Sequence, residues 1–239
     1  MNTPDTPLIT APAQTAPLIA AVGISRRDPL SDRLLLQPVD FALAAGDRVA
    51  VSGRSGSGKS VLLRSLALLD PVAGGSIRWH GTVVAREAIP LYRRHVCYLG
   101  QRAALFEGSV EDNLRYPFSL KVAGQQRFDP DNVLALLDQA GRDKAFLRKR
   151  ISELSGGEAQ ITAVIRVLQL DPQVLLLDEP TASLDPESAL RVEHLVDSWC
   201  TAPAPVPRGY LWISHDPQQA LRMGTRQLHM ADGSLSEAS

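Results

Sequence analysis

The residues with the clearest chemistry form an unbroken stretch from Gly53 to Ser60. It matches the phosphate-binding pattern of four free positions between Gly and Gly-Lys-Ser. Its glycines can turn successive N–H groups inward as a cage for the β- and γ-phosphates of a nucleotide. Lys59 adds a positive charge at the phosphates, and Ser60 offers a hydroxyl to Mg²⁺. The expected nucleotide contacts in this stretch are Gly53, Arg54, Ser55, Gly56, Ser57, Gly58, Lys59, Ser60 and the following Val61.

The segments on either side of this loop give it the setting that the motif needs. Residues 47–52 predict a short buried strand that runs into the loop, and residues 61–69 predict an apolar helix that leaves it. The positive end of that helix points at the bound anion. The loop alone predicts nucleotide binding, but it does not distinguish a kinase from a GTPase or a motor.

Two carboxylates follow a second, fully apolar strand predicted at residues 174–177. Asp178 is placed to hold the water shell of Mg²⁺, and Glu179 is a free base beside the γ-phosphate. A base at that position favours hydrolysis over phosphate transfer. The alternative is that the two carboxylates only cap the turn at Pro180.

Two further predicted strands end in polar side chains. Residues 95–100 end at Gln101, and residues 210–214 end at His215. Right-handed crossovers bring the carboxyl ends of parallel strands to one edge of a sheet. We therefore expect Gly53, Gln101, Asp178 and His215 to converge on the nucleotide.

Length and composition predict one α/β domain. The chain has 239 residues, is 44% hydrophobic and has a net charge of -1, so no basic field indicates a nucleic acid partner. Cys97 and Cys200 have no metal-ligand spacing and are expected to be ordinary thiols. No apolar run approaches the roughly 20 residues that span a bilayer. Residues 1–17, rich in Thr, Pro and Ala, are expected to be a flexible leader.

The remaining pattern predicts an antiparallel sheet, a helical insertion and a return to alternating strand and helix. Residues 18–25 are expected to be an edge strand, and residues 39–43 a second strand beside it. Further predicted elements are a hairpin at 76–84, a capping box at 109–112, and helices at 132–140, 158–169, 186–199 and 216–223.

The motif from Leu154 to Glu158 makes the prediction specific. Ser155, Gly156 and Gly157 open a helix and so form a second phosphate site, although one loop binds one nucleotide. The second site is expected to serve the nucleotide of a neighbouring chain. With this motif, the sequence from about residue 18 to 232 resembles the ATP-binding subunits of ABC transporters.

The resemblance implies a fold and a division of the chain. The implied fold is α/β: a P-loop NTPase core of mostly parallel sheet with helices on both faces, an antiparallel β subdomain and an inserted α-helical signature subdomain. A single ABC ATPase domain would span 18–239, with the β subdomain and loop core at 18–101, the helical subdomain at 102–172 and the core completed at 173–239.

The resemblance also implies ATP and Mg²⁺ as cofactors, and a homodimer that sandwiches two ATP molecules. Each residue then has an implied role. Glu179 is the general base, and Asp178 and Ser60 hold Mg²⁺. Gln101 senses Mg²⁺ and water, and His215 contacts the γ-phosphate. Asp185 lies in the loop that communicates across the dimer, and the residues that contact the partner's ATP are Ser155, Gly156 and Gly157.

Three positions depart from the family pattern. No aromatic residue stands where the family stacks the adenine, and we expect Arg26 or Arg27 to stack there, with a solvated loop arginine as the alternative. Val61 replaces a Ser or Thr, which removes one hydrogen bond worth about 0.5 to 1.5 kcal/mol. Ile161 stands where an Arg is usual, which puts one charge contact in doubt.

The expected partner is a transmembrane permease subunit. The aromatic segments 105–108 and 116–118 predict a docking groove between Gln101 and Phe118 for a helix of that subunit, with a core role for the aromatics as the alternative. The chain would then lie on the cytoplasmic face of the inner membrane.

Two short stretches, residues 113–118 and 165–169, resemble the ATPases of bacterial iron-export systems most closely. A nutrient importer or a lipid-handling system is the alternative. Soluble ABC ATPases that act on nucleic acid or ribosomes share the same motifs, but the segment between Lys59 and Ser155 is too short for a long coiled coil. A small-molecule kinase would have no use for the second glycine pair.

Overall fold

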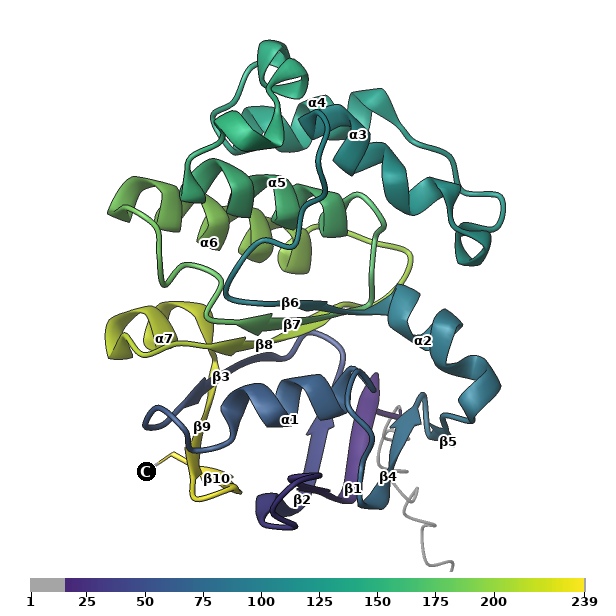
Figure 1. Ribbon diagram of the computed structural model, residues 1–239, viewed down its shortest axis with the longest axis vertical. Helices are drawn as coiled ribbons and strands as arrows, with labels where there is room; N and C mark the ends of the chain where they lie inside the picture. Colours follow the sequence, from purple (N-terminus) through teal and green to yellow (C-terminus); the bar gives the residue numbers. More distant parts are fainter. Residues whose placement is uncertain (1–15, 239) are drawn as a thin grey trace, which may run out of the picture.

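The computed structural model describes residues 16–238 as two sheets with one helix between them and a group of helices above (Figure 1). The predicted leader 1–17 lies almost entirely outside the described residues. The strands are β1 (Ile19–Arg27), β2 (Leu34–Leu43), β3 (Arg48–Ser52), β4 (Gly74–Trp79), β5 (Thr82–Val83), β6 (Val96–Leu99), β7 (Val174–Asp178), β8 (Gly209–Ile213), β9 (Arg226–Ala231) and β10 (Ser234–Glu237).

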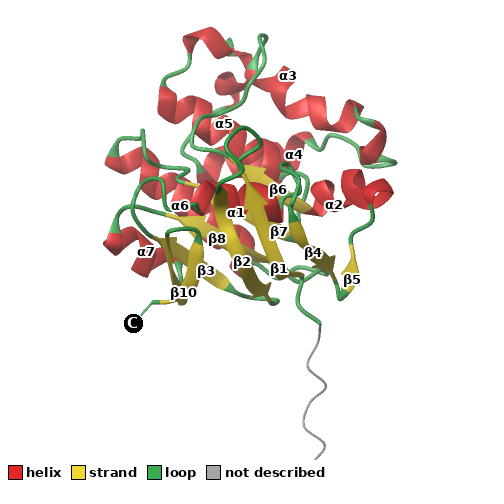
Figure 2. Cartoon of the chain, turned by 60° about the horizontal axis from the view of Figure 1, so that its bottom comes forward, coloured by secondary structure: helices red, strands yellow, loops and turns green. Residues whose placement is uncertain are grey.

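Within residues 16–238, seven α-helices connect these strands, and short 3₁₀ turns extend several of them. Figure 2 shows most helices on one side of the strands. The helices are α1 (Lys59–Leu66), α2 (Ile89–His95), α3 (Val110–Arg115), α4 (Pro130–Gln139), α5 (Gly156–Leu168), α6 (Pro186–Thr201) and α7 (Pro217–Met223); the 3₁₀ turns are Arg86–Ala88, Tyr116–Ser119, Lys121–Ala123, Lys144–Arg148 and Ile151–Glu153.

The larger sheet has the order β10-β9-β3-β8-β7-β6, and the strands from β9 to β6 are parallel. Its central strands are buried on both faces. On β7, Val174 and Leu176 face the core around α1, while Leu175 and Leu177 face the core under α5 and α6. This explains why residues 174–177 are continuously apolar. The parallel order brings the ends of β6, β7 and β8 to one edge, as the sequence predicts.

The smaller sheet is antiparallel with the order β2-β1-β4-β5. The prediction that residues 18–25 form an edge strand is wrong, because β1 pairs with β2 on one side and β4 on the other. Apolar and polar residues alternate only weakly along β1 because its pairing register with β2 shifts between Ala21 and Ile24. Gly23, within this shift, has a positive φ of 58°. The edges of this sheet are β2 and β5.

Helices α3, α4 and α5 lie between β6 and β7 in the chain. Ser109 caps α3 with the predicted capping box, and Asp129 caps α4 through the backbone N–H groups of Asp131 and Asn132. Helices α5 and α6 cover the larger sheet (Figure 1). In the described part of the chain, no helix is both long and apolar enough to cross a bilayer.

The last two strands, β9 and β10, were not expected from the sequence. Strand β9 pairs in parallel with β3 and buries Leu228 and Met230, and β10 returns antiparallel to it. The turn between them is Asp232-Gly233, where both residues have positive φ. This dipeptide is a strong hairpin signal that could have located the strands.

Candidate nucleotide-binding and hydrolysis site

The loop from Gly53 to Ser60 joins β3 to α1 and needs glycine at its turns. Gly53, Gly56 and Gly58 have φ values of 143°, 76° and 107°, which side-chain-bearing residues rarely adopt. A Cβ atom on Gly53 would also lie 2.2 Å from the carbonyl oxygen of Met230. The neighbouring strand β9 therefore restricts this position to glycine.

Lys59 is buried and folds back over the loop. Its Nζ donates to the carbonyl oxygens of Gly53 at 2.8 Å and Arg54 at 3.0 Å. Burial lowers the pKa of this ammonium group, while the charges of Glu179 and Asp178 act in the opposite direction. The loop thus presents a cation and inward-turned backbone at the helix start, and these groups fit a polyphosphate.

Ser60 and Asp178 meet at the edge of the larger sheet. The Ser60 hydroxyl donates to Asp178 Oδ1 at 3.0 Å, and the Tyr98 hydroxyl donates to the other carboxylate oxygen at 2.9 Å. Hard oxygen ligands such as these suit Mg²⁺, which usually takes few protein ligands and completes its shell with water and phosphate. Accordingly, residues 16–238 hold no cluster of three or more His, Cys, Asp or Glu side chains that could bind a metal alone.

Tyr98 was not singled out from the sequence. Burial raises the pKa of its hydroxyl, and the charge of Asp178 adds to this, so the group stays protonated as a donor. Tyr98 lies opposite Leu176 in the β6–β7 register, so Asp178 is its diagonal neighbour on the same face. The contact between Tyr98 and Asp178 follows from the pairing of β6 with β7 and cannot be read from the sequence near either residue.

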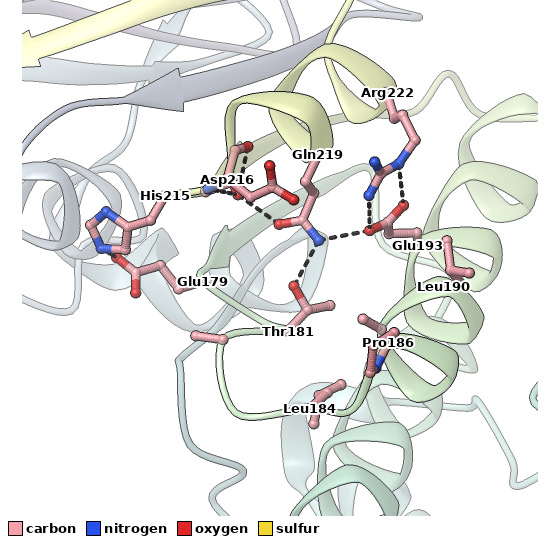
Figure 3. A pocket seen from close by; sticks show the side chains of 13 residues that line it. Glu179, Thr181, Leu184, Pro186, Leu190, Glu193, His215, Asp216, Gln219 and Arg222 are labelled. Carbon is pink, nitrogen blue, oxygen red and sulfur yellow. Dashed lines mark hydrogen bonds and ion pairs between the residues drawn. The ribbon is translucent and has the colours of Figure 1, made fainter.

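Gln101 and His215 both lie against Glu179, the residue that follows Asp178, at the edge where β6, β7 and β8 end. Gln101 Nε2 donates to Glu179 Oε2 at 3.3 Å, and His215 Nε2 contacts Glu179 Oε1 (Figure 3). The Glu179 side chain is 14% exposed and that of His215 is 48% exposed. Glu179 also has a positive φ of 50°, a strained conformation of the kind that often occurs at functional sites. The strand ends thus surround one carboxylate with an amide and an imidazole.

Ser155, Gly156 and Gly157 begin α5 at a different place from the loop. The Ser155 hydroxyl accepts from the Glu158 N–H at 3.2 Å, and Glu158 Oε2 accepts from the Ser155 N–H at 3.1 Å. Ser155 and Gly156 are exposed. Among the described residues, no hydrogen bond joins this helix start to the loop from Gly53 to Ser60.

Glu158 is itself held by two cations that the sequence analysis missed. Its Oε1 accepts from Lys149 Nζ at 2.9 Å and from an Arg142 N–H at 3.2 Å. The hydrogen bond from Lys149 lowers the pKa of the Glu158 carboxyl. The carboxylate that completes the cap of Ser155 is therefore fixed in its charged form.

The other expected positions lie as follows. Asp185 is exposed and caps α6 by accepting from the Ser188 N–H at 2.9 Å. Val61 packs against the core around α1, and Ile161 is fully buried in the core between α5 and the larger sheet, so both departures from the family pattern serve packing.

The two arginines expected near the adenine lie at the end of β1. Arg27 donates to the carboxylate of Asp32 at 3.0 Å and to its carbonyl at 2.9 Å, which restrains its guanidinium. In the same turn, the Leu30 side chain is 97% exposed. Stacking by Arg26 or Arg27 stays a prediction.

The glycine-rich loop after β3, the Ser60 hydroxyl bonded to Asp178, and Glu179 at the next position have the arrangement expected of a P-loop nucleotide hydrolase. The model of the ABC transporter family matches residues 36–182. The chain belongs to this family as an ATP-binding subunit, and it is an ATPase that uses ATP with Mg²⁺.

Three curated relatives illustrate the range of the family. Protein STAR1 of Oryza sativa subsp. japonica is 41% identical over 186 residues, covering 78% of this chain but only 53% of STAR1. The probable iron export ATP-binding protein FetA of Escherichia coli (strain K12) is 34% identical over 210 residues, covering 87% of this chain and 90% of FetA. The phosphate import ATP-binding protein PstB 2 of Natronomonas pharaonis is 35% identical over 231 residues, covering 92% and 79%.

A solved structure supports the fold. The dimeric post-hydrolysis structure of the ATP-binding cassette MJ0796 with ADP and Pi has a TM-score of 0.80 and 21% sequence identity, and covers 92% of this chain and 98% of that one. The predicted fold, a P-loop core with an antiparallel sheet and a helical segment, is confirmed.

Proposed function

We propose that this chain drives solute transport as a homodimer that holds two ATP molecules between its subunits. The observation that carries the proposal is the separation of two phosphate-binding features. The loop at Gly53 and the helix start at Ser155 are not joined by any hydrogen bond among residues 16–238, and Ser155 is exposed. A second copy can bring its Ser155 to the first copy's loop.

Within each site, this chain's residues divide the work. Lys59 and the loop bind the phosphates, and Ser60 and Asp178 hold Mg²⁺, which neutralises phosphate charge. Glu179 accepts the proton of the attacking water, and Gln101 and His215 orient its carboxylate through the contacts described above. Ser155, Gly156 and Gly157 supply N–H groups to the partner's ATP, and Asp185 faces the partner.

The substitution Glu179→Gln tests the role of the base. It keeps the shape of the side chain but removes its ability to take a proton. ATP binding should persist while the hydrolysis rate falls by at least about a hundredfold. The matched control is Glu237→Gln, the same change at an exposed carboxylate on β10. Hydrolysis at the parent rate in the Glu179→Gln variant would refute the assignment.

The permease is proposed to dock on the segment between Gln101 and Phe118. Phe106 and Tyr116 are 37% and 50% exposed, and their ring centroids lie 5.0 Å apart. Buried Asn113 accepts from the Phe106 N–H and donates to the Phe106 carbonyl, both at 3.0 Å. These bonds fix the backbone of Phe106, and its ring and that of Tyr116 together offer an apolar surface for a helix of the membrane subunit. Docking would place the chain on the cytoplasmic face of the membrane.

Alanine at Phe106 or Tyr116 should weaken co-purification with the membrane subunit and leave the ATPase rate of the isolated chain unchanged. Leu221→Ala is the control, because Leu221 is also exposed, at 71%, but lies on α7. Equal co-purification of all variants would place the docking site elsewhere.

The proposed cargo is iron, moved outward. The support is the near full-length match to FetA, which is named a probable iron export protein. Other relatives are named for the import of phosphate or molybdenum, so import is the competing direction. In cells lacking the chain, iron content after iron loading should rise, and the parent chain but not Glu179→Gln should lower it again. Unchanged iron content would reject this cargo.

A further inference from the structure

A buried polar network lies behind the contact between His215 and Glu179, and Gln219 on α7 is its centre (Figure 3). Gln219 is only 7% exposed. Its Oε1 accepts from the Ser214 hydroxyl at 2.7 Å and the Trp212 indole N–H at 3.3 Å. Its Nε2 donates to Thr181 Oγ1 at 2.8 Å and to Glu193 Oε1 at 2.7 Å.

These bonds use the whole hydrogen-bonding capacity of the amide. An amide has two N–H donors on one end and two oxygen lone pairs on the other. Here the oxygen faces two donors, and the nitrogen faces a hydroxyl and a carboxylate oxygen. The orientation of the Gln219 side chain is therefore fixed, and no other uncharged side chain of this length satisfies both ends.

Two of the four partners of Gln219 belong to the loops that carry the site. Ser214 immediately precedes His215 after β8, and Thr181 follows Glu179 by two residues on the way to Asp185. The fourth group, Glu193 on α6, is anchored by two hydrogen bonds from the Arg222 guanidinium, at 3.1 Å and 3.0 Å. One side chain thus ties both loops to α6 and α7.

The pairing of β7 with β8 fixes where both loops begin, because Asp178 lies opposite Ile213 at the strand ends. A cavity of about 660 Å³ beside both loops is lined by Glu179 and His215, and also by Pro186, Ala189 and Leu190. Figure 3 shows Gln219 at the wall of this cavity, between His215 and Glu193. Beyond the paired strand ends, the bonds of Gln219 to Ser214 and Thr181 connect the two loops beside this cavity.

We propose that Gln219 is a positioning residue, which holds the His215 loop and the segment after Glu179 at the spacing that lets the imidazole reach the carboxylate. The inference rests on the roles proposed above for Glu179 and His215. Gln219 touches neither nucleotide nor water in this role and acts through Ser214 and Thr181.

The test exchanges the amide and the carboxylate between positions 219 and 193. Gln219→Glu alone removes both N–H donors and sets two carboxylates against each other. We expect kcat to fall by about tenfold while the Kd for ATP changes by less than about twofold. Glu193→Gln alone leaves the Arg222 guanidinium without its carboxylate and should lower kcat less. The double variant Gln219→Glu/Glu193→Gln again has one carboxylate, one amide and one guanidinium, so kcat should return to within about threefold of the parent.

The control is Gln218→Glu, the same change at an exposed neighbour on α7, which should leave kcat and the melting temperature unchanged. The inference is overturned if Gln219→Glu keeps the parent kcat, or if the double variant is no faster than Gln219→Glu. It is also overturned if kcat and ATP affinity fall together with the melting temperature, because this indicates general loss of structure. If Glu179→Gln hydrolyses ATP normally, the proposed function fails instead, whatever the Gln219 variants do.

Discussion

The hydrogen bond from Tyr98 to Asp178 makes a sharp prediction about Mg²⁺. Tyr98→Phe removes one oxygen and keeps the ring that packs beside α1. Asp178, 6% exposed, then loses the donor that lies 2.9 Å from its Oδ2 and keeps only the Ser60 hydroxyl on Oδ1. The carboxylate becomes free to turn away from the position in which Ser60 and Asp178 together face the metal.

The size of the effect follows from the kind of bond. A hydrogen bond to a charged group contributes about 1.5 to 3 kcal/mol of stabilisation. Because Tyr98 is only half-buried, we expect a value near the lower end of that range. Since 1.4 kcal/mol corresponds to a factor of ten, the affinity for the metal in the ATP complex should fall by about tenfold. Losses of about this size are typical when a group that orients a metal ligand is removed.

The assay is a Mn²⁺ titration followed by electron paramagnetic resonance, with ATP saturating and Glu179→Gln present to prevent turnover. Tyr92→Phe is the matched control: it removes a buried tyrosine hydroxyl that donates to the Leu66 carbonyl at 2.6 Å, remote from Asp178. Both variants should lose similar stability, but only Tyr98→Phe should bind Mn²⁺ more weakly. Equal Mn²⁺ affinity in the two variants refutes the argument that Tyr98 orients Asp178.

Two further predictions concern the loop and the helix start. Gly53→Ala should abolish ATP binding measured by calorimetry without unfolding the chain. The added Cβ would lie 2.2 Å from the Met230 carbonyl oxygen, so the loop could not keep its shape. Binding at parent affinity would show that the loop can shift. Glu158 has a lowered pKa in the folded chain, so its stabilising effect is present above the usual glutamate pKa and is lost as the pH falls through the folded value. Glu158→Gln should therefore reduce the drop in melting temperature between pH 6 and about pH 3.5, and an unchanged drop would remove Glu158 as its source.

The sequence alone predicted the elements whose patterns are local. The strand, loop and helix around Gly53 are encoded within about twenty consecutive residues, and the apolar run before Asp178 indicates a strand buried on both faces. The expectation that Gln101, Asp178 and His215 lie at one edge followed from one rule about the ends of parallel strands. These predictions needed no knowledge of which distant segments touch.

The features that the sequence did not reveal depend on pairing between distant segments. The central place of β1 depends on β4, which lies almost fifty residues later, and its bulge hides the alternation. Tyr98 and Asp178 are 80 positions apart, and Thr181 and Gln219 are 38 apart. Nothing in the local pattern marks Tyr98 or Gln219 as more than core residues.

The split site is tested most directly by the size of the chain in the presence of MgATP. The Glu179→Gln variant should elute from a sizing column as a dimer with MgATP and as a monomer without it. Adding Ser155→Arg to that variant should return it to a monomer that still binds ATP, because the arginine blocks the helix start that meets the partner's phosphate. A dimer that persists in the double variant would contradict a site shared between two copies of this chain.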